Sequence, residues 1–314
     1  MTDATMAAAT RLNSPAAAAR RRRQRARERV IEGLLLACAA VSVVTTVAIV
    51  GVLLFESVLF FSHVSIVEFL TSRTWTPLFA DAQYGILPLV LGTLLSSTVA
   101  LVVALPLGLV IAIYLSEFAD ERVRETLKPF LELLSGIPTV VYGYFALLFI
   151  TPLLQKTILP NLPGFNVLGA GIVMGIMIIP YISSLSEDAM RAVPNSLREG
   201  SLAMGATRLQ TSLKVVVPAA FSGLAAAGVL AISRAVGETM IVAIAAGQQP
   251  NFTFDPTQPA ATITAYIAQV ALGDLAHGSV AYQSIFAAGL TLMAMTLVFN
   301  LAGYALRRRF REAY

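Results

Sequence analysis

Two ionisable side chains of opposite charge, Arg234 and Glu238, lie four residues apart within the apolar segment ISRAVGETM. This spacing places both on one face of a helix, where they are expected to form an ion pair. Arg234 falls near the middle of an apolar run, 215–247, that is long enough to cross a membrane. An uncompensated Arg at such a depth costs at least ~2.5–3.5 kcal/mol. Either the pair only neutralises itself and orients helices, or its Arg meets an anion on a translocation pathway; we favour the pathway, because charges inside membrane spans usually face one.

Further polar groups in the apolar runs are candidates to line the same pathway. Thr139 and Tyr142 lie in SGIPTVVYGY, and Ser183 lies in the next apolar run. Gly237, between the two charged residues, permits close helix approach or local unwinding. The hydroxyl groups serve equally well as hydrogen bonds between helices, so both interpretations stay open.

Residues that other kinds of site require are missing from the sequence. A phosphate-cradling loop needs Gly-Lys-Ser or Gly-Lys-Thr, whereas each of the three lysines follows Leu or Gln. Any ATP must therefore be hydrolysed by another chain. His63 and His277 have no ligand partners at metal-site spacing, and the single cysteine, Cys38, excludes a thiolate cluster. We expect no metal site and no enzymatic activity.

The composition is typical of a membrane protein, because 57% of the 314 residues are hydrophobic and only 13% are charged. The apolar residues form long runs, so the expected fold class is an all-α membrane protein with six transmembrane helices. The first run is too long for a signal peptide and lacks a cleavage site, which favours an uncleaved span. The expected spans are at about residues 30–61, 86–115, 129–154, 167–186, 215–247 and 282–306.

The basic residues are distributed unevenly between the two sides of this arrangement. Nineteen Lys or Arg fall in the two tails and in the loops on the side of the tails, and two fall in the loops on the other side. Basic loops remain in the cytoplasm, so both termini and the loop 187–214 are predicted to be cytoplasmic. Residues 1–29 then form a basic, mostly disordered arm, and 30–310 form the transmembrane domain. Nucleic-acid binding is the weaker interpretation of such basic clusters.

The polar stretch Glu199–Pro218 separates two strongly apolar runs. Approximate helical spacing from Leu197 to Leu209 predicts a short amphipathic helix, and Gly205 marks a turn. Pro218 suits the first turn of the next helix, where its missing N–H has no partner to lose. Such an element at a membrane surface is either an anchor or a docking site.

The same stretch resembles the EAA loop of ABC-importer permeases, which inserts into a cleft of the cytoplasmic ATPase. Here Gly200 and Ser201 replace the two alanines of the pattern, which keeps the side chains small but lowers helix propensity. The resemblance implies an ATPase-docking loop, 187–214. Its docking residues are Glu199, Gly200, Ser201, Gly205, Ala206 and Pro218.

Three motifs narrow the resemblance to the PstC-type permeases of phosphate-specific ABC importers: SGIPTVVYGY at 135–144, VPNSLREGSLAMGAT at 193–207 and SRAVGET at 233–239. In that family the Arg and Glu of the third motif are important for phosphate movement, and these correspond to Arg234 and Glu238. The resemblance covers about residues 30–310 and implies a type I ABC importer permease in the bacterial cell membrane.

The family also implies partners. These are a second, PstA-like permease, two PstB-like ATPase subunits that use ATP and Mg, and an extracytoplasmic PstS-like phosphate-binding protein; this chain itself is expected to bind no cofactor. Another oxyanion, such as molybdate or sulfate, remains an alternative substrate. A secondary anion transporter or channel would need an ion-coupling site or inverted repeats, and neither is found. A membrane-embedded enzyme lacks a nucleophile–base pair, and a signalling role for 187–214 can coexist with transport.

Overall fold

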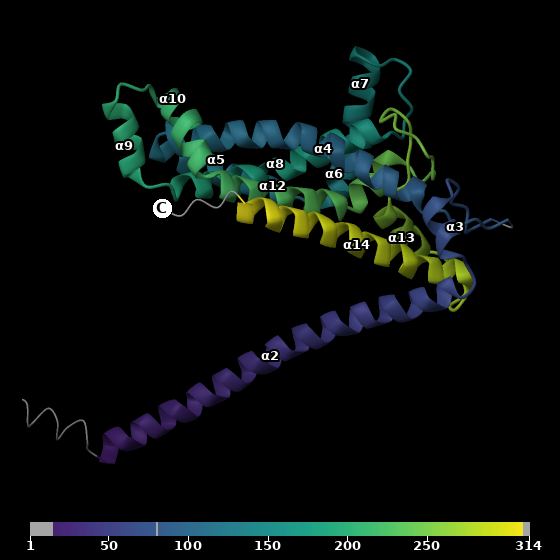
Figure 1. Cartoon of the computed structure of the whole chain (residues 1–314), viewed down its shortest axis with the longest axis horizontal. Helices are drawn as coiled ribbons and strands as arrows, with labels where there is room; N and C mark the ends of the chain where they lie inside the picture. The colour runs from purple at the N-terminus through teal and green to yellow at the C-terminus, as the bar shows by residue number, and fades with distance from the viewer. Residues whose placement is uncertain (1–14, 80, 310–314) are drawn as a thin grey trace, which may run out of the picture. The chain divides into compact units, whose positions relative to one another are not determined.

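A computed structural model describes residues 15–79 and 81–309, and its regular elements are helical apart from one isolated bridge between Trp75 and Tyr84. The chain divides into two compact units, Met1–Phe55 and Glu56–Tyr314. Figure 1 labels the helices of both units.

The described part of the first unit belongs to one helix, α2 (Pro15–Phe61), whose last residues lie in the second unit. Its apolar part, Arg27–Phe61, contains 35 residues and is therefore ~52 Å long. Because the hydrocarbon core of a bilayer is ~30 Å thick, a helix of this length tilts or projects beyond the core. The expected disorder of the arm falls partly on residues 1–14, which lie outside the described residues, whereas residues 15–29 are helical.

The second unit is a bundle of helices in which several spans are interrupted by π-helical turns, labelled η. In chain order its elements are α3 (Ile66–Thr71), α4 (Leu87–Ile113), η1 (Tyr114–Phe118), α5 (Glu121–Gly136), α6 (Thr139–Phe145), η2 (Ala146–Ile150), α7 (Thr151–Thr157), α8 (Val167–Arg191), α9 (Asn195–Ala203), α10 (Arg208–Thr211), η3 (Ser212–Val216), α11 (Val217–Ala219), α12 (Phe221–Val236), η4 (Val242–Ala246), α13 (Ile263–Ala271) and α14 (Val280–Arg309).

The core of this bundle lies where α4 and α8 pack against each other, with α12 against both. Ala100 and Ala104 of α4 are fully buried, as are Met174 and Ile178 of α8. Small residues at a helix contact let the backbones approach closely, which is the main source of helix association in a bilayer. Within this unit α9 and α10 lie at one end of the bundle, and α3 and α13 lie at the other (Figure 1).

Five helices in the described part of the chain are long and apolar enough to cross a membrane, and a sixth span results if one bent pair is counted together. That pair, Arg208–Ala219 and Phe221–Val236, bends by 72°. The expected span 215–247 is therefore not one continuous helix, although six spans remain if the bent pair is counted as one. The physical reason lies near Pro218, which has no N–H for the carbonyl four residues earlier and is followed by a break at Ala220.

The third expected span, 129–154, combines parts of two different helices. Amphipathic α5 ends at Gly136, and α6 begins at Thr139, after Pro138. The break predicted at Gly136 and Pro138 is confirmed. Its physical cause is Pro138, because the residue before a proline disfavours the helical conformation. The apolar helix that can cross a membrane is Thr139–Thr157, while residues 129–136 belong to α5, none of whose residues is buried.

The segment expected to be a polar loop, 248–281, contains α13, which packs into the bundle. Ile263, Ala265 and Tyr266 of this helix are buried. Trp75, which suits a membrane interface by its type, is also buried, and its ring centroid lies 5.0 Å from that of Tyr266. Local polarity predicted exposed loops, but these aromatic contacts join segments far apart in the sequence.

We expect Gly92→Ala to destabilise this end of the bundle. A Cβ at Gly92 on α4 would collide with the backbone carbonyl oxygen of Ala261, just before α13, and a backbone atom cannot move aside as a side-chain tip can. Overpacking of this kind costs about 1–3 kcal/mol, so the unfolding temperature of the purified protein should fall. The matched control is Gly51→Ala on α2, whose Cβ meets nothing within 4 Å and should not lower that temperature. Equal unfolding temperatures for the two variants would contradict the close contact.

Candidate functional site

Arg234 and Glu238 meet at an interruption between two helical segments. Arg234 lies in the last turn of α12, which ends at Val236, and Gly237 caps that end. Glu238 follows in non-helical backbone, so the two residues do not share one continuous helix, as their spacing suggested. The ion pair nevertheless forms, with Arg234 Nη2 3.8 Å from Glu238 Oε2.

The carboxylate of Glu238 is buried and held by backbone groups. Its side chain is 3% exposed, and Oε1 accepts hydrogen bonds from the N–H groups of Met240 (3.1 Å) and Ile241 (3.4 Å). It therefore caps the helical turn that begins at Met240, as acidic side chains do at helix N-termini. The backbone carbonyl of Glu238 also accepts from Thr264 Oγ1 on α13 at 2.6 Å, which fixes the interruption itself.

The guanidinium of Arg234 is less well satisfied than its partner. Besides the 3.8 Å contact, Nη2 approaches Met177 Sδ at 3.9 Å, and Cζ lies 5.9 Å from the ring centroid of Tyr181. The buried Nε has no hydrogen-bond partner among the residues that the structure describes. Since a guanidinium carries five N–H donors and this side chain is still 40% exposed, Arg234 retains donors for an incoming anion.

The other expected pathway residues occupy different environments. Tyr142 donates to the carbonyl of Leu134 at 2.7 Å, which joins the end of α5 to α6. Ser183 is fully buried and donates to the carbonyl of Pro180 at 3.2 Å. Thr139 is half-buried at the start of α6. Pathway roles for these three residues and for Gly237 stay predictions.

Tyr181 is the aromatic residue that the structure brings to Arg234. It lies four residues after Met177 on α8, so both side chains reach the same face of α12. The sequence marks Tyr181 only as one of several polar groups in its span. Its place beside Arg234 depends on the packing of α8 against α12, for which no local pattern exists.

The expected docking loop, 187–214, includes two short helices, α9 and α10, joined by a left-handed glycine. Gly205 follows α9 and precedes α10. Its φ of 85° is left-handed, so the turn predicted there is present. Thr207 begins α10 with a capping box, in which its side chain and that of Gln210 satisfy each other's backbone N–H groups. Ser201 and Thr211 lie 2.9 Å apart through their hydroxyls and tie α9 to the end of α10. This hairpin of helices is therefore well defined.

The outer surface of this hairpin is apolar and exposed. Met204 is 89% exposed, and Leu202, Leu209 and Leu213 are also exposed; we call these four residues the docking tip. Exposed apolar side chains on neighbouring helices suit a protein interface. Of the six expected docking residues, Glu199, Gly200, Gly205 and Pro218 are exposed, and Ser201 and Ala206 are half-buried.

A buried carboxylate near the same end was not expected from the sequence. Glu187, at 1% exposure, lies 3.1 Å from Lys128 Nζ and within 4 Å of Arg124 and Arg191. Lys128 also contacts Asp188 at 2.9 Å. Partial burial lowers the pKa of Lys128, but hydrogen bonds to Asp188 and Glu187 raise it by more, so the net shift is upward. This cluster joins α5 to α8.

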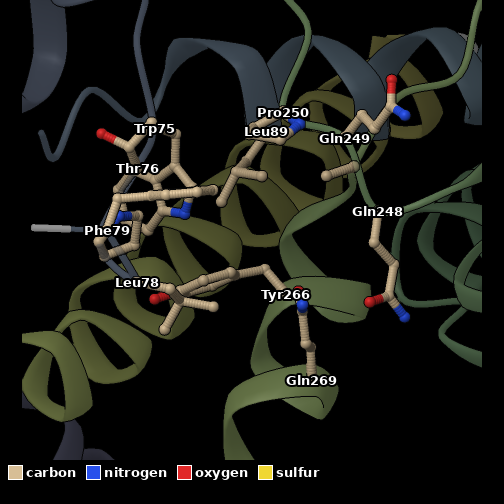
Figure 2. A pocket seen from close by; sticks show the side chains of 12 residues that line it. Trp75, Thr76, Leu78, Phe79, Leu89, Gln248, Gln249, Pro250, Tyr266 and Gln269 are labelled. Atoms are coloured by element: carbon tan, nitrogen blue, oxygen red, sulfur yellow. The ribbon is translucent and has the colours of Figure 1, made fainter. Parts of the chain in front are cut away.

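Two cavities lie at the opposite end of the bundle, and no charged residue lines either of them. Figure 2 shows one of about 270 Å³, with Trp75, Leu78 and Phe79 on one side and Tyr266 on another. A second cavity of about 490 Å³ adjoins the same Gln248 and Gln249 and includes Phe165. Arg234 lines neither cavity. Among the described residues, no three His, Cys, Asp or Glu gather as a metal site.

Comparisons with known proteins define the class. Residues 104–312 match the family described as "Binding-protein-dependent transport system inner membrane component". The chain is 40% identical over 268 residues to the probable ABC transporter permease protein YqgH of Bacillus subtilis (strain 168), covering 84% of this chain and 86% of that protein. It is 35% identical over 263 residues to the phosphate transport system permease protein PstC of Mesorhizobium japonicum, covering 77% and 78%.

A solved structure of a bacterial alginate ABC transporter, in complex with an alginate pentasaccharide-bound periplasmic protein, contains a similar chain. The TM-score is 0.62 at 18% identity, over 88% of this chain and 94% of that one, which supports the fold. The chain belongs to the family of binding-protein-dependent transport system inner membrane components, the permeases of ABC importers.

Several expectations are thereby confirmed. The chain has the type I ABC importer permease fold and is a multi-pass protein of the inner membrane. It is a non-enzymatic transmembrane component, because ATP is hydrolysed by a separate subunit. Its family functions with a second permease, ATPases and a substrate-binding protein.

Proposed function

We propose that this chain is a PstC-like subunit that moves inorganic phosphate into the cytoplasm, with both termini and the docking loop on the cytoplasmic side. The observation that carries the proposal is the pair at the end of α12: a partly satisfied Arg234 held only loosely by a buried, backbone-bound Glu238. Similarity to a permease named for phosphate transport supports this substrate.

The geometry suits transient binding of an oxyanion. Phosphate carries one to two negative charges near neutral pH, and its oxygens match the fork of a guanidinium. An arriving anion takes Arg234 from Glu238 across a 3.8 Å contact that is already long. Glu238 then keeps its hydrogen bonds from Met240 and Ile241, so it is not left as an unsolvated charge. Its negative charge also weakens the bound state, which helps the anion to leave.

The two ends of the bundle bind different partner subunits in this proposal. PstB-like ATPases bind the docking tip and the residues around Gly205, while a PstS-like binding protein delivers phosphate at the opposite end, and a PstA-like permease completes the pathway. Molybdate and sulfate present the same tetrahedral oxygens to Arg234, so selection between the anions falls to the binding protein.

Reconstitution of the complete importer in proteoliposomes tests the substrate. We expect phosphate-loaded binding protein to stimulate ATP hydrolysis and uptake of labelled phosphate, and sulfate or molybdate at the same ionic strength to have no effect. Empty binding protein serves as the control. Stimulation by sulfate or molybdate without phosphate would reassign the transported anion.

A further inference from the structure

We propose that Arg198 transmits movement of the docking helix α9 to two membrane spans, α4 and α8, by holding the ends of both at once. This proposal deepens the proposed function, because it rests on α9 belonging to the ATPase-docking loop. Arg198 is thus a positioning residue, which acts on the transport site through other elements.

The contacts of Arg198 use all three nitrogens of its guanidinium group. Nε and Nη2 donate to the two carboxylate oxygens of Glu117, at 3.1 and 2.9 Å, in the paired arrangement that is strongest for Arg and a carboxylate. Nη2 also donates to the carbonyl of Met190 at 2.8 Å. Nη1 donates to the carbonyl of Val193 at 2.6 Å and to Asn195 Oδ1 at 3.2 Å.

Each partner belongs to a different part of the bundle. Glu117 lies in η1, directly after α4, and is 81 residues away in sequence. Met190 lies in the last turn of α8, and its carbonyl accepts from the Val193 N–H at 3.2 Å as well as from Arg198. Arg198 therefore caps α8, clamps the end of α4 and belongs itself to α9.

Burial makes this junction more consequential than a surface ion pair. The side chains of Arg198 and Glu117 are 17% and 8% exposed, so water competes little for them. Exposed ion pairs contribute little to stability, whereas losing one partner of a shielded pair leaves an uncompensated charge. Helix α9 has no fully buried residue, and its apolar contact with the spans is made by Leu197, which packs against a cluster that includes Ala112 of α4 and Met190 of α8. Arg198 adds to this contact a directional, hydrogen-bonded connection to the same two spans.

The spans that Arg198 holds form part of the surroundings of Arg234. Tyr181 and Met177, both on α8, lie beside the Arg234 guanidinium, and α4 packs along α8. A second route follows the chain itself from α10 through η3 and the bend at Ala220 into α12. A displacement of α9 can therefore reach Arg234 by two routes. One follows the chain through α10 and η3 into α12, and the other passes through Arg198 to α4 and α8.

Two neighbouring residues on α9 have different roles: one faces a partner subunit and the other holds the spans. Glu199 is exposed and available to a partner, whereas Arg198 points into the junction. A Lys at position 198 keeps the charge but offers three donors from one point, so it cannot hold Glu117 in two places while also reaching Met190 and Val193. Arg198→Lys is therefore a test of geometry at constant charge.

The test measures anion imported per ATP hydrolysed by the complete importer in proteoliposomes. We expect Arg198→Lys to retain the ATPase subunits and to hydrolyse ATP, while the transport-to-hydrolysis ratio falls about ten-fold, within the usual range of coupling between sites. Glu117→Gln should lower the ratio similarly, and the double variant should be no worse than either single one, because both remove one junction. The matched control, Arg122→Lys on the exposed face of α5, should leave the ratio unchanged.

Two results would overturn the proposal: a wild-type ratio in both single variants, or transport and hydrolysis falling together at a constant ratio, as expected of a purely stabilising residue. Failure of the proposed function is distinguishable from either. If phosphate is not the substrate, the wild-type complex itself shows no phosphate uptake, and the ratio is measured with the anion that it does transport.

Discussion

Arg234→Gln is expected to abolish anion import while leaving the importer assembled. Gln keeps a polar side chain at the end of α12 but removes the charge and the fork of donors that the anion needs. Without Arg234 the transported anion has no positively charged partner at this site. Losing one partner of a hydrogen-bonded charge pair costs about 2–5 kcal/mol, so the initial rate of uptake should fall by roughly two orders of magnitude or more. The measurement is uptake of labelled phosphate, with co-purification of the ATPase as the readout of assembly.

Glu238→Gln should alter the same site in a different way. The amide oxygen can still accept from the N–H of Met240, so the cap on the next helical turn is retained. Arg234, however, loses the negatively charged carboxylate with which it pairs. We expect tighter anion binding and slower release, seen as a lower KM together with a lower maximal rate. Arg122→Gln, on α5, is the control for loss of a positive charge elsewhere.

Uptake by Arg234→Gln at the wild-type rate would remove Arg234 from the pathway. The pair would then be an ion pair that only orients α12 and the turn after it. A variant that loses both uptake and ATPase binding would indicate misassembly, and Arg234→Lys, which keeps the charge, then serves as the second test: it should assemble and transport at a reduced rate.

Gly205→Ala is expected to weaken binding of the ATPase to the docking loop. With a φ of 85°, Gly205 adopts a backbone conformation that costs any other residue about 1–2 kcal/mol, even though a Cβ there meets nothing within 4 Å. The variant therefore changes the angle between α9 and α10 without a clash. If the loop conformation that binds the ATPase is destabilised by about 1–2 kcal/mol, the affinity for the ATPase falls roughly five- to thirty-fold.

Gly51→Ala provides the matched control, because a Cβ at Gly51 also meets nothing within 4 Å but the residue lies inside α2, outside the docking loop, with ordinary helical geometry. Ala favours the helix there, so ATPase affinity should be retained. The measurement is the dissociation constant of the ATPase subunits for the permease pair in nanodiscs. Equal affinity for both variants would show that the turn at Gly205 has no role in docking.

Local sequence determined the features that depend on neighbouring residues. Long apolar runs identified the membrane spans, because hydrocarbon excludes polar side chains and unpaired backbone groups. Gly136 and Pro138 marked a helix break, and Gly205 marked a left-handed turn, since each restricts its own backbone. Arg234 and Glu238 were evident from position alone, because a charge in an apolar span is rare and expensive.

Only the tertiary structure decided which side chains meet across the bundle. The partners Arg198 and Glu117 are 81 residues apart, Lys128 reaches Asp188 across 60, and Tyr181 meets Arg234 from another helix. Burial of α13 and Trp75, inside segments of polar composition, likewise depends on aromatic contacts between distant segments. The physical reason is that hydrophobicity and helix-breaking residues act locally, whereas the register and rotation of packed helices follow from contacts over the whole unit.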